Sequence, residues 1–152
     1  MKNFYDLIKE LGDLLGEEIE PENNQACNLR INQKVKVQIE VSNNEESLML
    51  ISLISELPPG KFRETVLKDI LKANFFAEEK VGILSYTLKE NSLVLFQTIN
   101  THALDAEELK NHLQKFSQRA INWYDSIESG ALAPDNEIPE STEKKGNSFG
   151  IR

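Results

Sequence analysis

Residues 35–41 read VKVQIEV, a stretch in which β-branched apolar residues alternate with polar ones. A period of two residues places the apolar side chains on one face of a strand and the polar side chains on the other. The pattern therefore predicts a half-buried strand. Residues 27–31 alternate in the same way, and Asn32-Gln33 leaves room only for a tight turn. The two segments together predict an antiparallel hairpin.

The sequence on either side of this hairpin predicts further strands and three helices. Two prolines after Leu57 end the sheet run, because proline lacks a backbone donor and has a fixed φ. In chain order we expect a helix over 4–15, strands over 27–31, 35–41 and 48–57, a helix over 62–76, strands over 83–88 and 93–96, and a long helix over about 106–128. This order, α-β-β-β-α-β-β-α, predicts an α+β fold with an antiparallel twisted sheet of about five strands.

The chain is long enough for one domain, which we place at residues 1–130. From about Pro134 onward, polar residues, Pro and Gly dominate. Such a composition buries too little apolar surface to offset the entropy lost on ordering, so we predict a flexible C-terminal tail over residues 131–152.

Composition excludes several classes of partner. The formal net charge of -8 disfavours binding to nucleic acid and to anionic membrane surfaces. The longest apolar run, residues 48–54, is far shorter than the roughly 20 residues of a membrane helix. The start of the chain lacks the apolar core of a secretory signal, and the single cysteine gives no disulfide. We therefore expect a cytoplasmic protein that does not insert into membranes.

The residues that could support catalysis are few and scattered. We expect Cys27 to be a buried inert thiol, and His112 to be a surface residue of the last helix. The sequence shows no metal-binding spacing, no nucleophile elbow and no phosphate-binding glycine loop, so we predict no cofactor and no enzymatic activity. The alternative from this class is a small hydrolase that uses Cys27, His102 or His112.

The strongest functional signal is a surplus of apolar surface. Residues 48–57 and 93–96 are apolar on both strand faces for most of their length, and the apolar arc of the middle helix is wider than one sheet contact requires. A homodimer built around that helix would bury the second side. The residues predicted for this dimer interface are Phe62, Val66, Leu67, Ile70, Leu71 and Leu95.

The order of elements and several local signatures resemble the class I type III secretion chaperones (the Tir chaperone, or CesT-like, family). The resemblance covers roughly residues 1–130. It rests on the amphipathic helix at 4–12, the alternating run 35–41, Leu57-Pro58-Pro59 before the middle helix, and residues 71–75 and 82–85 after it. The last helix adds the family spacing of Phe116, Ala120 and Trp123.

The resemblance implies a homodimer in the bacterial cytoplasm that binds the N-terminal segments of secreted effector proteins. The segment is kept partly unfolded, soluble and ready for export, and it binds partly by adding a strand to a sheet edge. ATP hydrolysis is left to a partner, the secretion ATPase. The hydrophobic groove implied for the effector comprises Phe4, Leu7, Ile8, Leu11, Val37, Ile39, Leu50 and Ile54. A protein-binding adaptor on the same fold, without a role in secretion, is the alternative.

Overall fold

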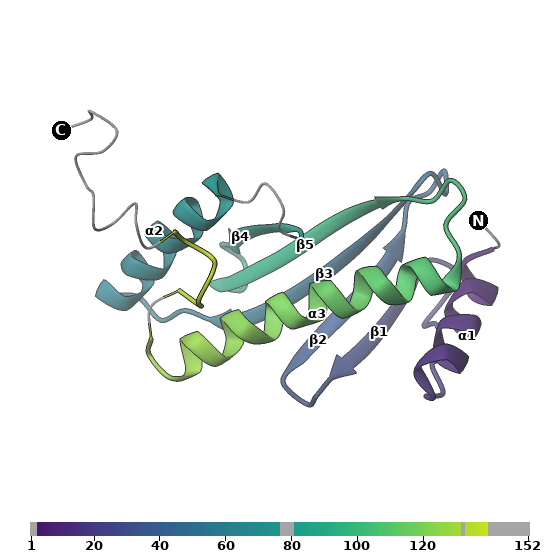
Figure 1. The fold of residues 1–152 in the computed structure, drawn as a ribbon, viewed down its shortest axis with the longest axis horizontal. Coiled ribbons are helices and arrows are strands. Elements are labelled where there is room, and N and C mark those ends of the chain that lie inside the picture. Colours follow the sequence, from purple (N-terminus) through teal and green to yellow (C-terminus); the bar gives the residue numbers. More distant parts are fainter. Residues whose placement is uncertain (1–2, 77–80, 132, 140–152) are drawn as a thin grey trace.

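The computed structural model describes residues 3–76, 81–131 and 133–139. Within these ranges it contains a five-stranded antiparallel sheet and three helices, in the predicted order (Figure 1). The elements are α1 (Phe4–Leu15), β1 (Ala26–Ile31), β2 (Val35–Val41), β3 (Ser47–Glu56), α2 (Lys61–Phe75), β4 (Ile83–Thr87), β5 (Ser92–Asn100) and α3 (Ala106–Glu128). The predicted α+β fold is confirmed.

The strands lie in the order β1-β2-β3-β5-β4, so β1 and β4 form the two edges of the sheet. All neighbouring strands are antiparallel. The first three strands follow one another as a meander, whereas α2 separates β3 from the second hairpin. Because β5 returns beside β3, β4 is placed at the outside, where it contacts α2.

Local signals in the sequence determine where the elements begin and turn. The side chain of Asn3 accepts a hydrogen bond from the Asp6 amide at 2.9 Å and caps α1. Asp105 accepts from the Glu108 amide at 2.8 Å and caps α3 in the same way. In the turn between β1 and β2, Asn32 and Gln33 have φ values of 51° and 58°, as in the mirror-image turns that suit the twist of a hairpin.

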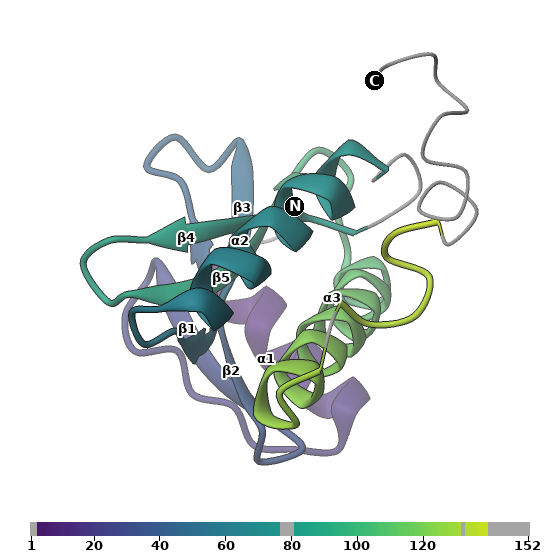
Figure 2. The same ribbon diagram turned by 90° about the vertical axis from the view of Figure 1, so that its left-hand side faces the viewer.

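The core lies between α3 and one face of the sheet. Figure 1 shows α3 running along the sheet, with α1 near its start and α2 at the opposite end. Figure 2 views the α2 end and shows α2 beside β4. Trp123 and Phe116 of α3 are almost fully buried, which confirms that they pack in the core. Among the described residues, no helix has the length and apolar composition needed to cross a membrane.

The packed part of the chain does not end at residue 130. Glu137 is buried against Arg119 of α3, and Ile138 packs against the core. Part of the segment predicted as a flexible tail over residues 131–152 is therefore packed, through the ion pair of Glu137 and the contact of Ile138, and the boundary at residue 130 stays a prediction. Residues 140–152 of the predicted tail lie outside the described residues.

Candidate protein-binding surfaces

One face of the sheet carries apolar side chains and is not covered by α3. The alternation of each strand sends one set of side chains toward α3 and the other set to the opposite side. The register pairs Ile51 with Phe96 and Leu53 with Val94 on that opposite side. We call it the open sheet face, and it comprises Met49, Ile51, Leu53, Ile83, Val94 and Phe96. Leu53 is 49% exposed and Ile83 is 53% exposed, so the face is accessible.

A second apolar surface lies on α2. Val66, Ile70 and Ala73 face the core, whereas other apolar side chains of the same helix point away from it. Leu71 is 70% exposed and Phe75 is 79% exposed. We call this surface the outer α2 patch, and it comprises Leu71 and Phe75, with the partly buried Leu67 one turn before them. Phe62 lies on the same stripe as Val66 and Ile70 and is exposed only because it is near the start of the helix. An arc of this width confirms the prediction that α2 has more apolar surface than its own sheet covers.

The two edges of the sheet differ in their hydrogen bonding. At the β4 edge, the Asn74 side chain accepts from the Leu84 amide at 3.0 Å and donates to the Leu84 carbonyl at 2.8 Å. These are the bonds that an added strand would make at this residue. Asn74 therefore seals the β4 edge at Leu84.

The β1 edge has backbone groups that point outward. The Val41 amide donates to the Gln25 carbonyl, so Gln25 and Val41 form a hydrogen-bonded pair of the antiparallel ladder. Hydrogen-bonded pairs alternate with non-bonded pairs along such a ladder. The next bonded pairs are therefore Cys27 with Ile39 and Leu29 with Val37. It follows that the amide and carbonyl groups of Asn28 and Arg30 point away from β2. Beside them, a groove of about 450 Å³ lies between the end of α1, β1 and α3, with walls that include Leu29, Leu113 and Ile121. This edge and groove are suited to an extended peptide.

The structure places the residues predicted for the effector groove inside the protomer. Each is less than 5% exposed: Phe4, Leu7, Ile8 and Leu11 of α1, and Val37, Ile39, Leu50 and Ile54 of the sheet. The helical face of α1 packs toward α3, and these strand residues lie on the face that α3 covers. Their role in effector binding stays a prediction that would require the helices to move. The same strand β3 presents Ile51 and Leu53 on the open sheet face without any movement.

The residues predicted for the dimer interface divide into two groups. Val66, Ile70 and Leu95 are almost fully buried in the single protomer, so their side chains offer no surface to a second copy. Phe62 and Leu71 are exposed, and Leu67 is half-buried. Only this second group lies where another chain can reach it. The sequence showed that the apolar arc of α2 is wide. It did not show which side of this arc faces the core.

The candidate catalytic residues are not brought together. Cys27 is fully buried, and burial together with the negative charge of Glu22 raises the pKa of its thiol to about 11. A protonated, inaccessible thiol is a poor nucleophile. His112 lies 3.4 Å from the Gln97 side-chain amide, and His102 is on the surface. Within the described ranges, no three His, Cys, Asp or Glu side chains are close enough to hold a metal ion.

Some residues of these surfaces were not among the predicted sites. The sequence did not indicate Ile83, Phe75 or Asn74, because no periodic pattern marks them. Their roles follow only from the packing of α2 against β4. Arg119 did leave a signal, since it lies at the margin of the apolar stripe of α3, beside Phe116 and Trp123. A charged residue at such a position is buried only with a partner.

Comparison with known proteins gives one family. The family model described as "Tir chaperone protein (CesT) family" matches residues 6–124. No curated protein sequence is similar enough to be matched to the chain.

Solved structures with a similar fold include a type III secretion chaperone and several protein complexes. A chain of the ExsC–ExsE complex is 15% identical, with a TM-score of 0.63 over 88% of this chain and 98% of that one. The Yersinia pestis type III secretion chaperone SycH, solved with a fragment of YscM2, is 22% identical, with a TM-score of 0.59 over 77% and 96%. A chain of the ExoT–SpcS complex from Pseudomonas aeruginosa is 14% identical, with a TM-score of 0.56 over 80% and 97%. At these identities the likeness concerns the fold.

Proposed function

Since this chain belongs to the Tir chaperone protein (CesT) family, we propose that it is a type III secretion chaperone that binds effector proteins. It holds an N-terminal effector segment partly unfolded and soluble in the bacterial cytoplasm until export. The observation that carries the proposal is an open apolar sheet face together with a β1 edge at which the backbone groups of Asn28 and Arg30 point outward. Several neighbouring structures are complexes of such proteins with a bound partner.

In this mechanism the backbone and the apolar side chains of the effector segment bind to different parts of the protomer. An extended stretch pairs with the outward backbone groups of Asn28 and Arg30, so its main chain is recognised whatever its sequence. Apolar side chains enter the groove beside β1 and cover the open sheet face. Wrapping of this kind buries on the order of 1,000–3,000 Å², which offsets the entropy of ordering the segment. The net charge of -8 favours effector segments with Lys or Arg beside the apolar anchors.

We propose that two copies pair through the outer α2 patch. Leu71 and Phe75 are the most exposed apolar residues of α2, and their burial against a second copy would remove them from water. The protein acts by binding and not by catalysis, which the inaccessible Cys27 supports. Any ATP hydrolysis during export belongs to the secretion ATPase.

The β1 edge can be tested with a proline. We propose Arg30→Pro, because the Arg30 amide points outward and proline removes this one donor without breaking the ladder with β2. Arg30→Ala is the matched control, since it removes the same charge and keeps the amide. N-terminal segments of the bacterium's type III effectors, fused to a reporter, would be screened for co-purification. Their affinity would then be measured by titration calorimetry.

We expect Arg30→Pro to bind the captured segment at least about tenfold more weakly, while Arg30→Ala stays within about threefold of the wild type. Leu53→Glu on the open sheet face should also weaken binding. If Arg30→Pro folds normally and binds with unchanged affinity, the added strand at β1 is excluded. An assay of whether the captured protein is exported separates a secretion chaperone from an adaptor on the same fold.

A further inference from the structure

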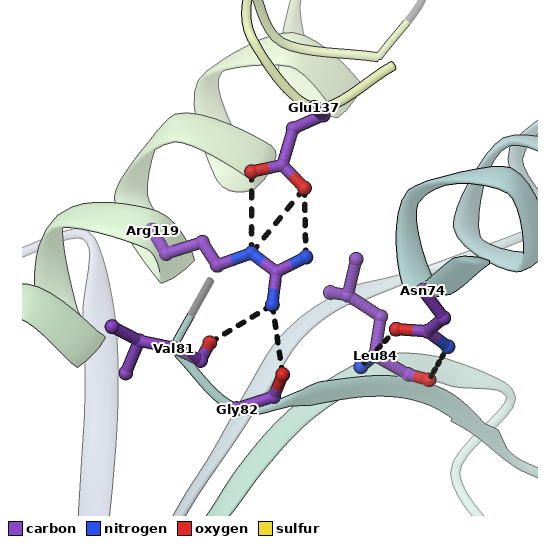
Figure 3. A network of polar contacts seen from close by, with 6 residues as sticks. All are labelled: Asn74, Val81, Gly82, Leu84, Arg119 and Glu137. Atoms are coloured by element: carbon purple, nitrogen blue, oxygen red, sulfur yellow. Dashed lines mark hydrogen bonds and ion pairs between the residues drawn. The ribbon is translucent and has the colours of Figure 1, made fainter. Parts of the chain in front are cut away.

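A buried charged pair joins the second half of α3 to residue 137, beyond the end of that helix. Arg119 and Glu137 have side chains that are 6% and 9% exposed, and they approach to 2.7 Å between Nη2 and Oε1. Arg119 Nε also donates to the Glu137 carboxylate, at 3.2 Å to Oε2 (Figure 3). A buried guanidinium without its counter-charge is strongly unfavourable. The position of Glu137, thirteen residues beyond the family match that ends at 124, is therefore tied to Arg119.

The other side of the guanidinium holds the start of β4. Arg119 Nη1 donates to the carbonyls of Val81 and Gly82 at 2.8 and 3.0 Å. Gly82 has a φ of 79°, and a Cβ atom there would lie 2.8 Å from the Phe96 carbonyl. Only glycine fits this close approach to β5. The ion pair thus fixes a turn that leads directly into β4.

The segment that contains Glu137, residues 133–139, also contacts α2. The Ala133 amide donates to the Asp69 carboxylate of α2 at 3.3 Å. From α2, Asn74 bonds to Leu84 of β4, two residues after the turn that Arg119 holds. Residues 133–139 therefore contact α3 through Glu137 and α2 through Ala133. The helices α3 and α2 in turn both bond to β4 or to the turn before it.

We propose that residues 133–139 act as a C-terminal clasp that holds α2 and the start of β4 in place against α3. Since α2 carries the outer α2 patch, the clasp keeps this patch in the arrangement that pairs with a second copy. This second part rests on the proposed dimer. Residues 133–139 lie beyond the matched family region, whereas Arg119 lies within it.

The test removes the charge of Glu137 and measures local opening. Hydrogen exchange by mass spectrometry compares the full-length protein with Glu137→Gln, and with Glu128→Gln as the matched control at an exposed site of α3. A chain truncated after residue 139 keeps the clasp, and a chain truncated after residue 131 lacks it. Sedimentation velocity on each variant gives the dissociation constant of the dimer.

We expect Glu137→Gln and truncation after residue 131 to speed amide exchange in α2 and at residues 81–87 by about tenfold or more, while α1 and β1 stay unchanged. Self-association should weaken in these two proteins only. In an Arg119→Met background, Glu137→Gln should have a much smaller effect on exchange, because no buried cation remains.

Two results would overturn the clasp: unchanged exchange in α2 and β4, or a uniform rise over the whole protein that reflects global stability alone. If every variant, including the full-length protein, is monomeric, the proposed dimer is excluded. The local exchange still decides for or against the clasp in that case.

Discussion

Cys27 shows how a fold removes the reactivity that a side chain has in the unfolded chain. Burial, with the charge of Glu22, raises the pKa of the thiol from 9.0 to about 11. Between these values the unfolded thiol loses its proton while the folded thiol keeps it. The stabilisation is therefore complete below about pH 9 and is lost as the pH rises through about 11.

This linkage gives a measurable pH dependence. Between about pH 8 and about pH 11, we expect the free energy of unfolding of the wild type to fall by about 2–3 kcal/mol more than that of Cys27→Ala. Urea denaturation of both proteins across this range measures the difference, and the other groups that titrate there are common to both. Parallel pH profiles would show that the buried thiol has no such linkage.

At the scale of an element, the turn between β1 and β2 has an unfavourable residue. Gln33 has a φ of 58°, a left-handed conformation that glycine adopts more readily than glutamine. We expect Gln33→Gly to raise the free energy of unfolding by about 0.5–1 kcal/mol. Lys36→Gly, at an exposed position of β2, is the control and should lower it by a similar amount. Chemical denaturation decides, and a loss of stability in Gln33→Gly would contradict the turn geometry.

The elements also show what the sequence could predict. The alternation of residues 35–41 and the two prolines after Leu57 predicted the type and order of the elements, because those signals are local. The choice between the two apolar faces of β3 was not local. Leu50 and Ile51 are both apolar, and only the packing of α3 decides that Leu50 is buried and Ile51 remains on the open sheet face.

The same limit applies to Glu137. It lies in a stretch of low hydrophobicity, where composition predicts no packing. Its role depends on Arg119, eighteen residues earlier in the chain. A contact between two charged residues at such a separation leaves no periodic pattern.

At the scale of the whole molecule, the outer α2 patch predicts concentration-dependent stability. Anything that binds only the folded state stabilises it, so a second copy should raise the thermal midpoint as the protein concentration rises. We expect Leu71→Glu to weaken self-association by at least about 30-fold, equivalent to about 2 kcal/mol. Leu14→Glu, at an exposed leucine of α1, is the matched control.

Light scattering after size exclusion, over a range of loading concentrations, measures the association of all three proteins. A dimer of Leu71→Glu as stable as the wild-type dimer would place the interface elsewhere. The open sheet face would then be the next surface to test.

The side-chain amide of Asn74 has one more consequence, which concerns the edge of the sheet at which a strand can be added. A sheet whose two edge strands both have unpaired backbone groups can add strands at either edge and grow into a filament. Here the backbone groups of Leu84 already have hydrogen bonds from the Asn74 side chain, so at this residue the β4 edge does not offer the bonds that an added strand needs. A guest strand is therefore expected to pair at the β1 edge, and association of copies through their β4 edges is disfavoured.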